Sequence, residues 1–333
     1  MTERLKTNLY AKHRLAFRED GRFKVLMLSD IQESADYNEK SLRAVEGMVA
    51  AERPDLVMLG GDNAYGPAVR TPEELTAMLD AFTAPMERRG IPWAHVFGNH
   101  DHDLPFGGDV QQAIYERYPH CVSKRTPSDI HGVTNFVLPV HRHDGDAVAF
   151  AVWGLDSNNT MDGLDSLVPG GDMAAEGRLD NRPVGGGLWD IPRFDQLMWY
   201  WNSSVELEEH CGGKVPGLLC MHIAPFEFLT AIHNPEACGL RGEADETPDP
   251  GVLNSGLFAE ILQRGDIRCI GCGHTHKDTF DATYCGIRLC FDGCAGFTHY
   301  GIDERRGGRV FEIHEDDPWR IETRMLRALD VME

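Results

Sequence analysis

The sequence predicts an α/β fold in which two sheets pack together with helices outside. First, short apolar runs alternate with helical spacing of apolar residues between positions 23 and 97. This order is typical of a largely parallel sheet with right-handed crossovers. Second, several short strand-like segments follow one another after residue 267, which indicates a second, mixed or antiparallel sheet.

The first sheet is predicted from three buried strands and the helices between them. An apolar run from Phe23 ends in polar residues at Asp30, as a buried strand does. The helix that follows ends at Pro54, and the next begins at Thr71, where a capping hydroxyl precedes proline and two acids. The predicted strands are 23–29, 55–59 and 91–97, and the helices are 37–52 and 71–89.

The rest of the chain is predicted to hold more strands and two long loops. The loops, 156–190 and 224–253, are longer than most loops of a compact domain, and loops of this length are usually functional or disordered. Since rigid scaffolds place recognition on such segments, we expect them to set specificity. The strands are 133–140, 147–155, 215–221, 267–272, 278–284, 286–292, 309–314 and 319–324, and the helices are 190–210 and 255–264.

Composition and charge exclude several classes of protein. The 32 Lys and Arg against 53 Asp and Glu give a net charge of -21, which argues against nucleic acid as a partner. No run approaches the ~20 apolar residues that cross a bilayer, so no membrane association is expected. The charged N-terminus is not a secretory signal, and we expect a cytoplasmic protein.

The chain is interpreted as one domain over residues 1–333, because it has no internal repeat and no low-complexity linker. Its core spans about 23–325, and 1–20 is an N-terminal extension. The nine cysteines are scattered, and the Cys269-Ile270-Gly271-Cys272 match to CxxC has no second pair at zinc-ribbon spacing. We interpret Cys269 and Cys272 as buried strand thiols, and we expect a reducing compartment for the chain.

Polar segments follow the predicted strands and carry metal-type donors. Asp30, Asp62, Asn99 and His222 each come directly after a strand, where ligand sites of parallel sheets lie. Asp156 occupies a similar position. Carboxylate, carbonyl and imidazole donors suit Mn, Fe and Zn, and an aspartate shared by two metals fits a dinuclear hydrolytic centre.

Two further histidine segments extend this pattern. His274 and His276 are one residue apart, so in an extended segment they point the same way, and in a turn they can grip two neighbouring ions. His100 follows Asn99 and can face a substrate, where it would protonate a leaving oxygen or orient a phosphoryl group. Asp101 is the residue expected to hold the His100 imidazole in orientation.

The ordered segments resemble the calcineurin-like metallophosphoesterases. Their signature is D-x-H, G-D, G-N-H-[DE], a strand-end H and G-H-x-H, and the match covers about 23 to 300. Finer features resemble the purple-acid-phosphatase-related branch of plants and fungi. These are Leu155-Asp156-Ser157, Met221-His222-Ile223-Ala224-Pro225 with Glu227, Asn254-Ser255-Gly256 and the tail from Gly296 to Gly301.

The resemblance implies a four-layer α/β/β/α sandwich of two mixed sheets with a dinuclear centre of Fe, Mn or Zn. The first metal would take Asp30, Asp62 and His276. The second would share Asp62 and add Asn99, His222 and His274. A hydroxide that bridges the two ions would attack phosphorus in line, with His100 as the general acid or phosphoryl-positioning group.

One position departs from the family pattern: Gln32 stands where the common signature has histidine. Purple acid phosphatases also lack that histidine and use a tyrosine three residues after the G-D aspartate, where this chain has Tyr65. Either Gln32 or a Tyr65 phenolate would complete the first metal site. The alternative is that Tyr65 is not a metal ligand and only packs over the loop.

The substrate is expected to be a phosphorylated small molecule or a phosphoprotein. Candidate substrate-binding residues are Asn63, Glu227, His233 and His299. The leading hypothesis is a phosphomonoesterase or phosphodiesterase, and the rival is a catalytically weak or inactive scaffold with the same fold, which only Gln32 favours. A mononuclear zinc hydrolase would need a compact ligand set such as HExxH, which the sequence lacks.

Overall fold

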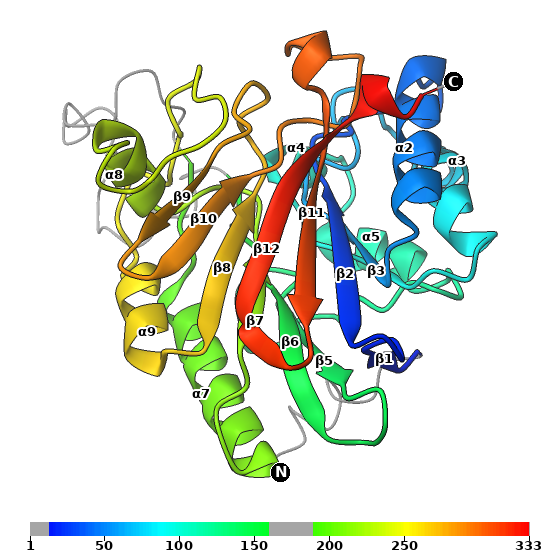
Figure 1. The fold of residues 1–333 in the computed structure, drawn as a ribbon. Helices are drawn as coiled ribbons and strands as arrows, with labels where there is room; N and C mark the ends of the chain where they lie inside the picture. The colour runs from blue at the N-terminus through cyan, green and yellow to red at the C-terminus, as the bar shows by residue number, and fades with distance from the viewer. Residues whose placement is uncertain (1–12, 160–188, 333) are drawn as a thin grey trace.

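The computed structural model describes residues 13–159 and 189–332, and it contains the two packed sheets that the sequence predicts. The five-stranded sheet has the order β12-β11-β2-β3-β4 and the seven-stranded sheet the order β1-β5-β6-β7-β8-β10-β9 (Figure 1). The strands are β1 Leu15–Ala16, β2 Arg22–Leu28, β3 Leu56–Leu59, β4 Trp93–His95, β5 Phe136–His141, β6 Val148–Gly154, β7 Gly217–Cys220, β8 Ile267–Cys272, β9 Asp281–Tyr284, β10 Ile287–Phe291, β11 Gly307–His314 and β12 Asp317–Arg327.

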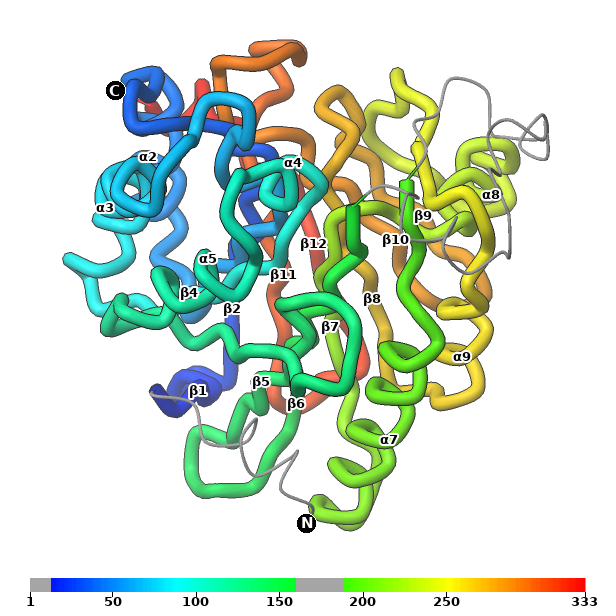
Figure 2. The backbone as a smooth tube through the Cα atoms, turned by 180° about the vertical axis from the view of Figure 1, so that it is seen from behind, coloured from blue at the N-terminus to red at the C-terminus, as the bar shows by residue number. Residues whose placement is uncertain are grey.

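Helices cover the outer face of each sheet, which gives the four-layer sandwich. One apolar core joins the five-stranded sheet to α2, α3 and α5, and another joins the seven-stranded sheet to α7, α8 and α9 (Figures 1 and 2). A third core fills the space between the sheets. The helices are α2 Glu39–Glu52, α3 Pro72–Glu87, α4 Asn99–His102, α5 Gly108–Tyr115, α7 Phe194–Cys211, α8 Glu227–His233 and α9 Leu257–Arg264, with short 3-10 turns at Asp303–Arg305 and Ala328–Asp330.

Local sequence signals explain the ends of the first helices. The Asn38 side chain accepts a hydrogen bond from the Lys40 backbone at 2.9 Å and caps α2. At α3, Thr71 and Glu74 form a reciprocal capping box, with Pro72 in the first turn. These caps fix where α2 and α3 begin, and so they set the ends of the loops that follow β2 and β3.

The grouping of the last strands differs from the prediction. β11 pairs antiparallel with β2, and β12 pairs with β11, so both belong to the sheet that carries β2, β3 and β4. β8, β9 and β10 instead extend the sheet of β5, β6 and β7. The prediction also placed residues 1–20 outside the core, whereas β1 pairs with β5 and Phe17 is buried. The helices α4, α5 and α8 were not predicted from the sequence.

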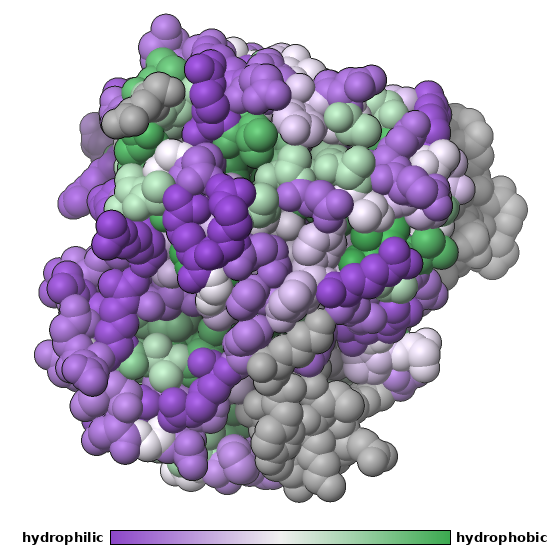
Figure 3. Space-filling model, turned by 90° about the vertical axis from the view of Figure 1, so that its right-hand side faces the viewer, coloured by the Kyte–Doolittle hydropathy of each residue, from purple (hydrophilic) through white to green (hydrophobic). Residues whose placement is uncertain are grey.

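The surface over the α2 and α3 side is largely hydrophilic, with only small hydrophobic areas between charged side chains (Figure 3). Within the described ranges, no helix is both long and apolar enough to cross a membrane. All nine cysteines are free. Cys269 and Cys272 are buried thiols of β8, as predicted.

His95 belongs to the core, as expected of a histidine inside a strand. It is fully buried in β4, its Nδ1 lies 2.7 Å from the Ser123 hydroxyl, and its ring stacks on Tyr115 with centroids 3.6 Å apart. Burial lowers the pKa of His95 to about 3. The neutral ring therefore stabilises the fold above pH 6.5, and that contribution is lost as the pH falls from about 6.5 towards 3.

We predict that His95→Gln flattens the acid side of the stability profile. Between pH 5.5 and 4.5, His95 should lower the free energy of unfolding of the wild-type protein by about 1.4 kcal/mol. The reason is that His95 binds a proton in the unfolded state and not in the folded state. Urea unfolding at several pH values measures this slope. His210→Gln, at an exposed histidine in the last turn of α7, is the control and should keep the wild-type slope.

Candidate metal centre

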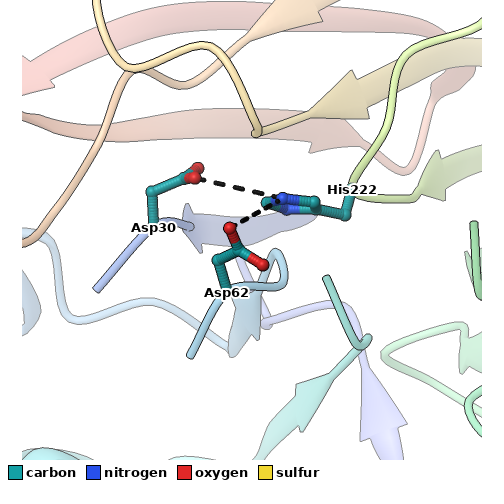
Figure 4. A group of neighbouring side chains, drawn as sticks. All are labelled: Asp30, Asp62 and His222. Carbon is teal, nitrogen blue, oxygen red and sulfur yellow. Dashed lines mark ion pairs between the residues drawn. The ribbon is translucent and has the colours of Figure 1, made fainter. Parts of the chain in front are cut away.

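Three predicted ligands lie together at the carboxyl ends of the strands. Asp30 follows β2, Asp62 follows β3 and His222 follows β7, so both sheets contribute. All three side chains are buried and point toward one another (Figure 4). One ligand atom from each lies within 4.8 Å of the others. The prediction that these strand ends converge is confirmed.

His222 and His276 each direct their Nε2 atom toward one of these carboxylates. His222 Nδ1 lies 3.0 Å from the Gly60 carbonyl oxygen, and His276 Nδ1 lies 2.8 Å from that of Tyr300. Because a carbonyl oxygen only accepts, each Nδ1 donates, and each Nε2 faces a carboxylate. His222 Nε2 lies 3.3 Å from Asp62 Oδ2, and His276 Nε2 lies 3.1 Å from Asp30 Oδ1. Such outer hydrogen bonds are typical of metal-ligating histidines.

The charges of the cluster are coupled. Burial alone would raise the pKa of Asp30 and Asp62, but the positive charges and hydrogen bonds of the neighbouring histidines, His222 foremost, together outweigh burial and lower the pKa of both. Burial likewise opposes protonation of the imidazoles, yet Asp62 and Asp30 raise the pKa of His222 to about 9, and Asp30 raises that of His276 to about 11. The carboxylates thus demand a positive partner, and any cation bound here competes with protons.

Several buried oxygen and nitrogen atoms of the cluster lack hydrogen bonds, and a bound cation would satisfy them. Among the described residues, the buried Asn99 Oδ1 has no hydrogen-bond partner, and the buried Asp30 Oδ1 and His222 Nε2 have only the ion-pair contacts of 3.1–4.0 Å within the cluster. Leaving buried polar atoms unpaired is costly, so each such atom calls for an explanation. Oxygen and imidazole donors in this combination suit divalent transition metals.

Backbone strain is concentrated in the turns that carry these side chains. Asp30, Gln32, Asp62 and His274 adopt left-handed conformations, with φ of 53°, 45°, 49° and 75°. Such conformations cost non-glycine residues of order 1–3 kcal/mol each and cluster at functional sites. Hydrogen bonds hold the turns in register: the Asp30 N–H donates to the Gly61 carbonyl at 3.0 Å, and the Gln32 N–H donates to the Asp62 carbonyl at 2.9 Å.

The structure places the remaining predicted ligands around this cluster. Gln32 Nε2 donates to Asp62 Oδ2 at 2.9 Å, so in this arrangement it orients the aspartate. The His274 ring lies 5.2 Å from that of His222, and the backbone N–H of His274 donates to Asp30 Oδ2 at 3.0 Å. The Tyr65 ring packs against the rings of His299, at 4.1 Å, and His100, at 5.5 Å.

The expected pairing of His100 with Asp101 is wrong. His100 Nδ1 lies 2.8 Å from Asp103 Oδ2, one turn further along α4. Asp101 is fully buried and accepts backbone N–H groups of Asn63, Ala64 and Gly98 at 2.9–3.2 Å. Asp101 therefore ties the turn after β3 to the start of α4. Burial and the nearby charge of Asp62 raise its pKa to about 6.

The candidate substrate-binding residues are scattered. Asn63 is buried, and its amide donates to the Val96 carbonyl at 3.0 Å, which corrects its assignment to substrate contact. His233 is exposed at the end of α8, and Glu227, at the start of that helix, lies 3.5 Å from the Asn254 amide. His299 is half-buried beside Tyr65, whose ring also contacts His100.

One supporting carboxylate, Asp292, was not predicted from the sequence. Asp292 follows β10 and is fully buried, and the Ser29 hydroxyl lies 2.6 Å from its Oδ1 and 2.5 Å from Asp30 Oδ2. Its place after a strand was the available signal. Asp156, in contrast, was singled out without a partner. The structure places its carboxylate 3.2 Å from His102 Nε2, beside the predicted acid–base segment.

The family follows from comparison with known proteins. The family model described as calcineurin-like phosphoesterase matches residues 23–278, which contain the whole cluster. The chain belongs to the calcineurin-like phosphoesterase family. Membership implies divalent metal ions, and the unpaired donors around Asp62 fit such ions.

Similar proteins match most of the chain. The "Probable inactive purple acid phosphatase 14" of Arabidopsis thaliana is 29% identical over 91% of this chain and 78% of its own length. "Phosphatase DCR2" of Saccharomyces cerevisiae is 25% identical over 91% of this chain and 54% of its own length. A dimetal phosphatase from Danio rerio superposes with a TM-score of 0.56 and 16% identity, over 90% of this chain and 98% of the other.

We predict that Gly98→Ala disturbs the cluster without unfolding the chain. A Cβ atom at position 98 would collide with the Asp62 carboxylate and backbone and lie 2.8 Å from the His222 ring, so one of them must move. Metal content after reconstitution should fall well below the about two ions per chain of a dinuclear site. Gly145→Ala, where a Cβ meets nothing within 4 Å, is the matched control, and an equal metal content in both variants would contradict the geometry.

Proposed function

We propose that the protein hydrolyses phosphate esters at a dinuclear metal centre built around Asp62. The observation that carries the proposal is the convergence of Asp30, Asp62 and His222, whose ligand atoms lie within 4.8 Å in a buried site. Burying two carboxylates side by side is costly unless positive charge lies between them. Family membership and the similarity to proteins named as phosphatases support the same reaction class.

The chain offers two overlapping ligand sets. Asp30, Asp62 and His276 would hold one ion, with Gln32 or Tyr65 next to it. Asp62, Asn99, His222 and His274 would hold the other, so that Asp62 is shared. We propose Fe, Mn or Zn, since oxygen and imidazole donors accept all three. Bound ions of this kind act as Lewis acids toward a phosphoryl oxygen and lower the pKa of a water molecule.

His100 is suited to act on the leaving group. Its side chain keeps 31% of its surface exposed, in contrast to the buried ligand cluster. Asp103 holds Nδ1, which leaves Nε2 free to donate a proton to the departing oxygen or to orient the phosphoryl group. The His100 backbone N–H donates to Asp62 Oδ1 at 2.8 Å, so the position of this residue is tied to the shared aspartate.

A cavity beside the centre provides room for the substrate. It has a volume of about 320 Å³ and is lined by Trp189, Glu246, Thr247, Asp249, His274, Thr275 and Tyr300. Residues 246–249 come from one of the two predicted specificity loops, and Trp189 lies within the other. We propose that a phosphorylated small molecule or a phosphoprotein side chain enters here.

A non-catalytic scaffold is the second candidate function. The observation that favours it is that three similar Arabidopsis proteins are named as probable inactive purple acid phosphatases. In this chain Gln32 also occupies the family's histidine position and donates to Asp62. A scaffold with this cluster would still bind metal, so activity and metal content have to be measured separately.

We predict that His100→Ala lowers kcat 10²- to 10⁴-fold and leaves metal content unchanged, because proton transfer is lost and the ligands remain. Turnover of p-nitrophenyl phosphate and its bis ester with Mn, Fe or Zn measures the first quantity, and elemental analysis measures the second. Asp62→Asn should lower both, and His210→Ala neither.

Equal loss of activity and metal in His100→Ala would contradict the role given to this residue. If the wild-type chain binds metal and hydrolyses no ester across a substrate panel, the scaffold function is favoured instead.

A further inference from the structure

A second cavity is lined by arginines. It has a volume of about 180 Å³, and its charged lining, here called the arginine pocket, consists of Arg241, Arg305, Arg309, Arg327, Glu243 and Asp281. Four guanidinium groups thus face two carboxylates in a chain whose net charge is -21. The arginine pocket shares no lining residue with the cavity beside His274.

Arg309 forms the floor of the arginine pocket. Arg309 is only 1% exposed, and its Nε and Nη2 donate to the carbonyls of Phe291 and Thr279 at 2.7 and 2.6 Å. The nearest carboxylate to it is Asp281, at 3.7 Å, which also faces Arg288 at 3.6 Å. The single negative charge of Asp281 therefore lies next to the two positive charges of Arg288 and Arg309, and it does not neutralise both.

Two arginines at the rim have no carboxylate of their own. The side chains of Arg241 and Arg327 are exposed and make no ion pair or hydrogen bond within the described part of the chain. The Arg241 backbone is fixed by reciprocal hydrogen bonds to Asp281, both at 2.8 Å. Arg305 is paired, with Glu243 at 3.5 Å and with Asp245. The free charges therefore stand at the entrance, above a fixed positive floor.

We propose that the arginine pocket binds an oxyanion of the phosphate type, either as free phosphate or as the phosphoryl group of a larger ligand. Guanidinium groups match such anions because their planar N–H pairs donate bidentate, charge-assisted hydrogen bonds. A partly buried position reduces screening by salt and water and strengthens this attraction. The anion would bind here without metal, which separates this site from the dinuclear centre.

Calorimetric titration of the full chain with inorganic phosphate, inorganic sulfate and phosphoserine tests the proposal. Each probe is titrated into metal-loaded protein and into protein dialysed against a chelator. The variant is Arg241→Gln/Arg327→Gln, which removes the unpaired rim charges and no buried contact. The control is Arg88→Gln/Arg320→Gln, whose side chains are 60% and 74% exposed on other surfaces, with the same loss of charge.

We expect at least one probe to bind the chelated wild-type protein, with at least tenfold weaker binding in the rim variant and less than twofold change in the control. In the metal-loaded rim variant, only the metal-dependent phosphate site should remain. Phosphoserine binding without phosphate binding would indicate a phosphorylated ligand, and the reverse would indicate the free anion. Equal affinity in the rim variant and the control, or binding of none of the probes, would overturn the proposal.

Discussion

The need for positive charge between two buried carboxylates governs this molecule. Asp30 and Asp62 are withdrawn from water at the junction of both sheets, and the imidazoles around them present Nε2. Backbone carbonyls occupy the other ring nitrogen of His222 and His276, so these rings cannot turn away. Protons or metal ions must therefore fill the centre, and the donor set is the kind that holds metal.

The rest of the fold keeps these side chains from relaxing. The strands end in turns with left-handed backbone at Asp30, Asp62 and His274, and a rigid apolar core lies directly beneath them between the sheets. Gly98 and Gly61 let the turns approach His222 so closely that any Cβ atom would collide. The stability of the sandwich thus maintains strained local conformations, which is the usual relation between a scaffold and its site.

The order of the elements along the chain and the strand ends were predictable from the sequence because they depend on local patterns, and the convergence of Asp62 with His222 followed from sheet topology. The sheet to which β11 and β12 belong was not predictable, since pairing between distant strands leaves no local pattern. The pairing of His100 with Asp103 required the short helix α4, which places residues three apart side by side. The four residues of α4 are too few for a helical period to be recognised.

Metal binding and catalysis are different properties of such a centre, and they are measured separately. The central claim concerns binding, and anomalous diffraction from crystals grown with Mn or Zn tests it most directly. We expect two anomalous peaks that flank the Asp62 carboxylate, one next to His276 and the other next to Asn99. Absence of a peak at Asp62, with metal bound only at the surface cluster of His143, Asp144 and Glu315, would contradict the account.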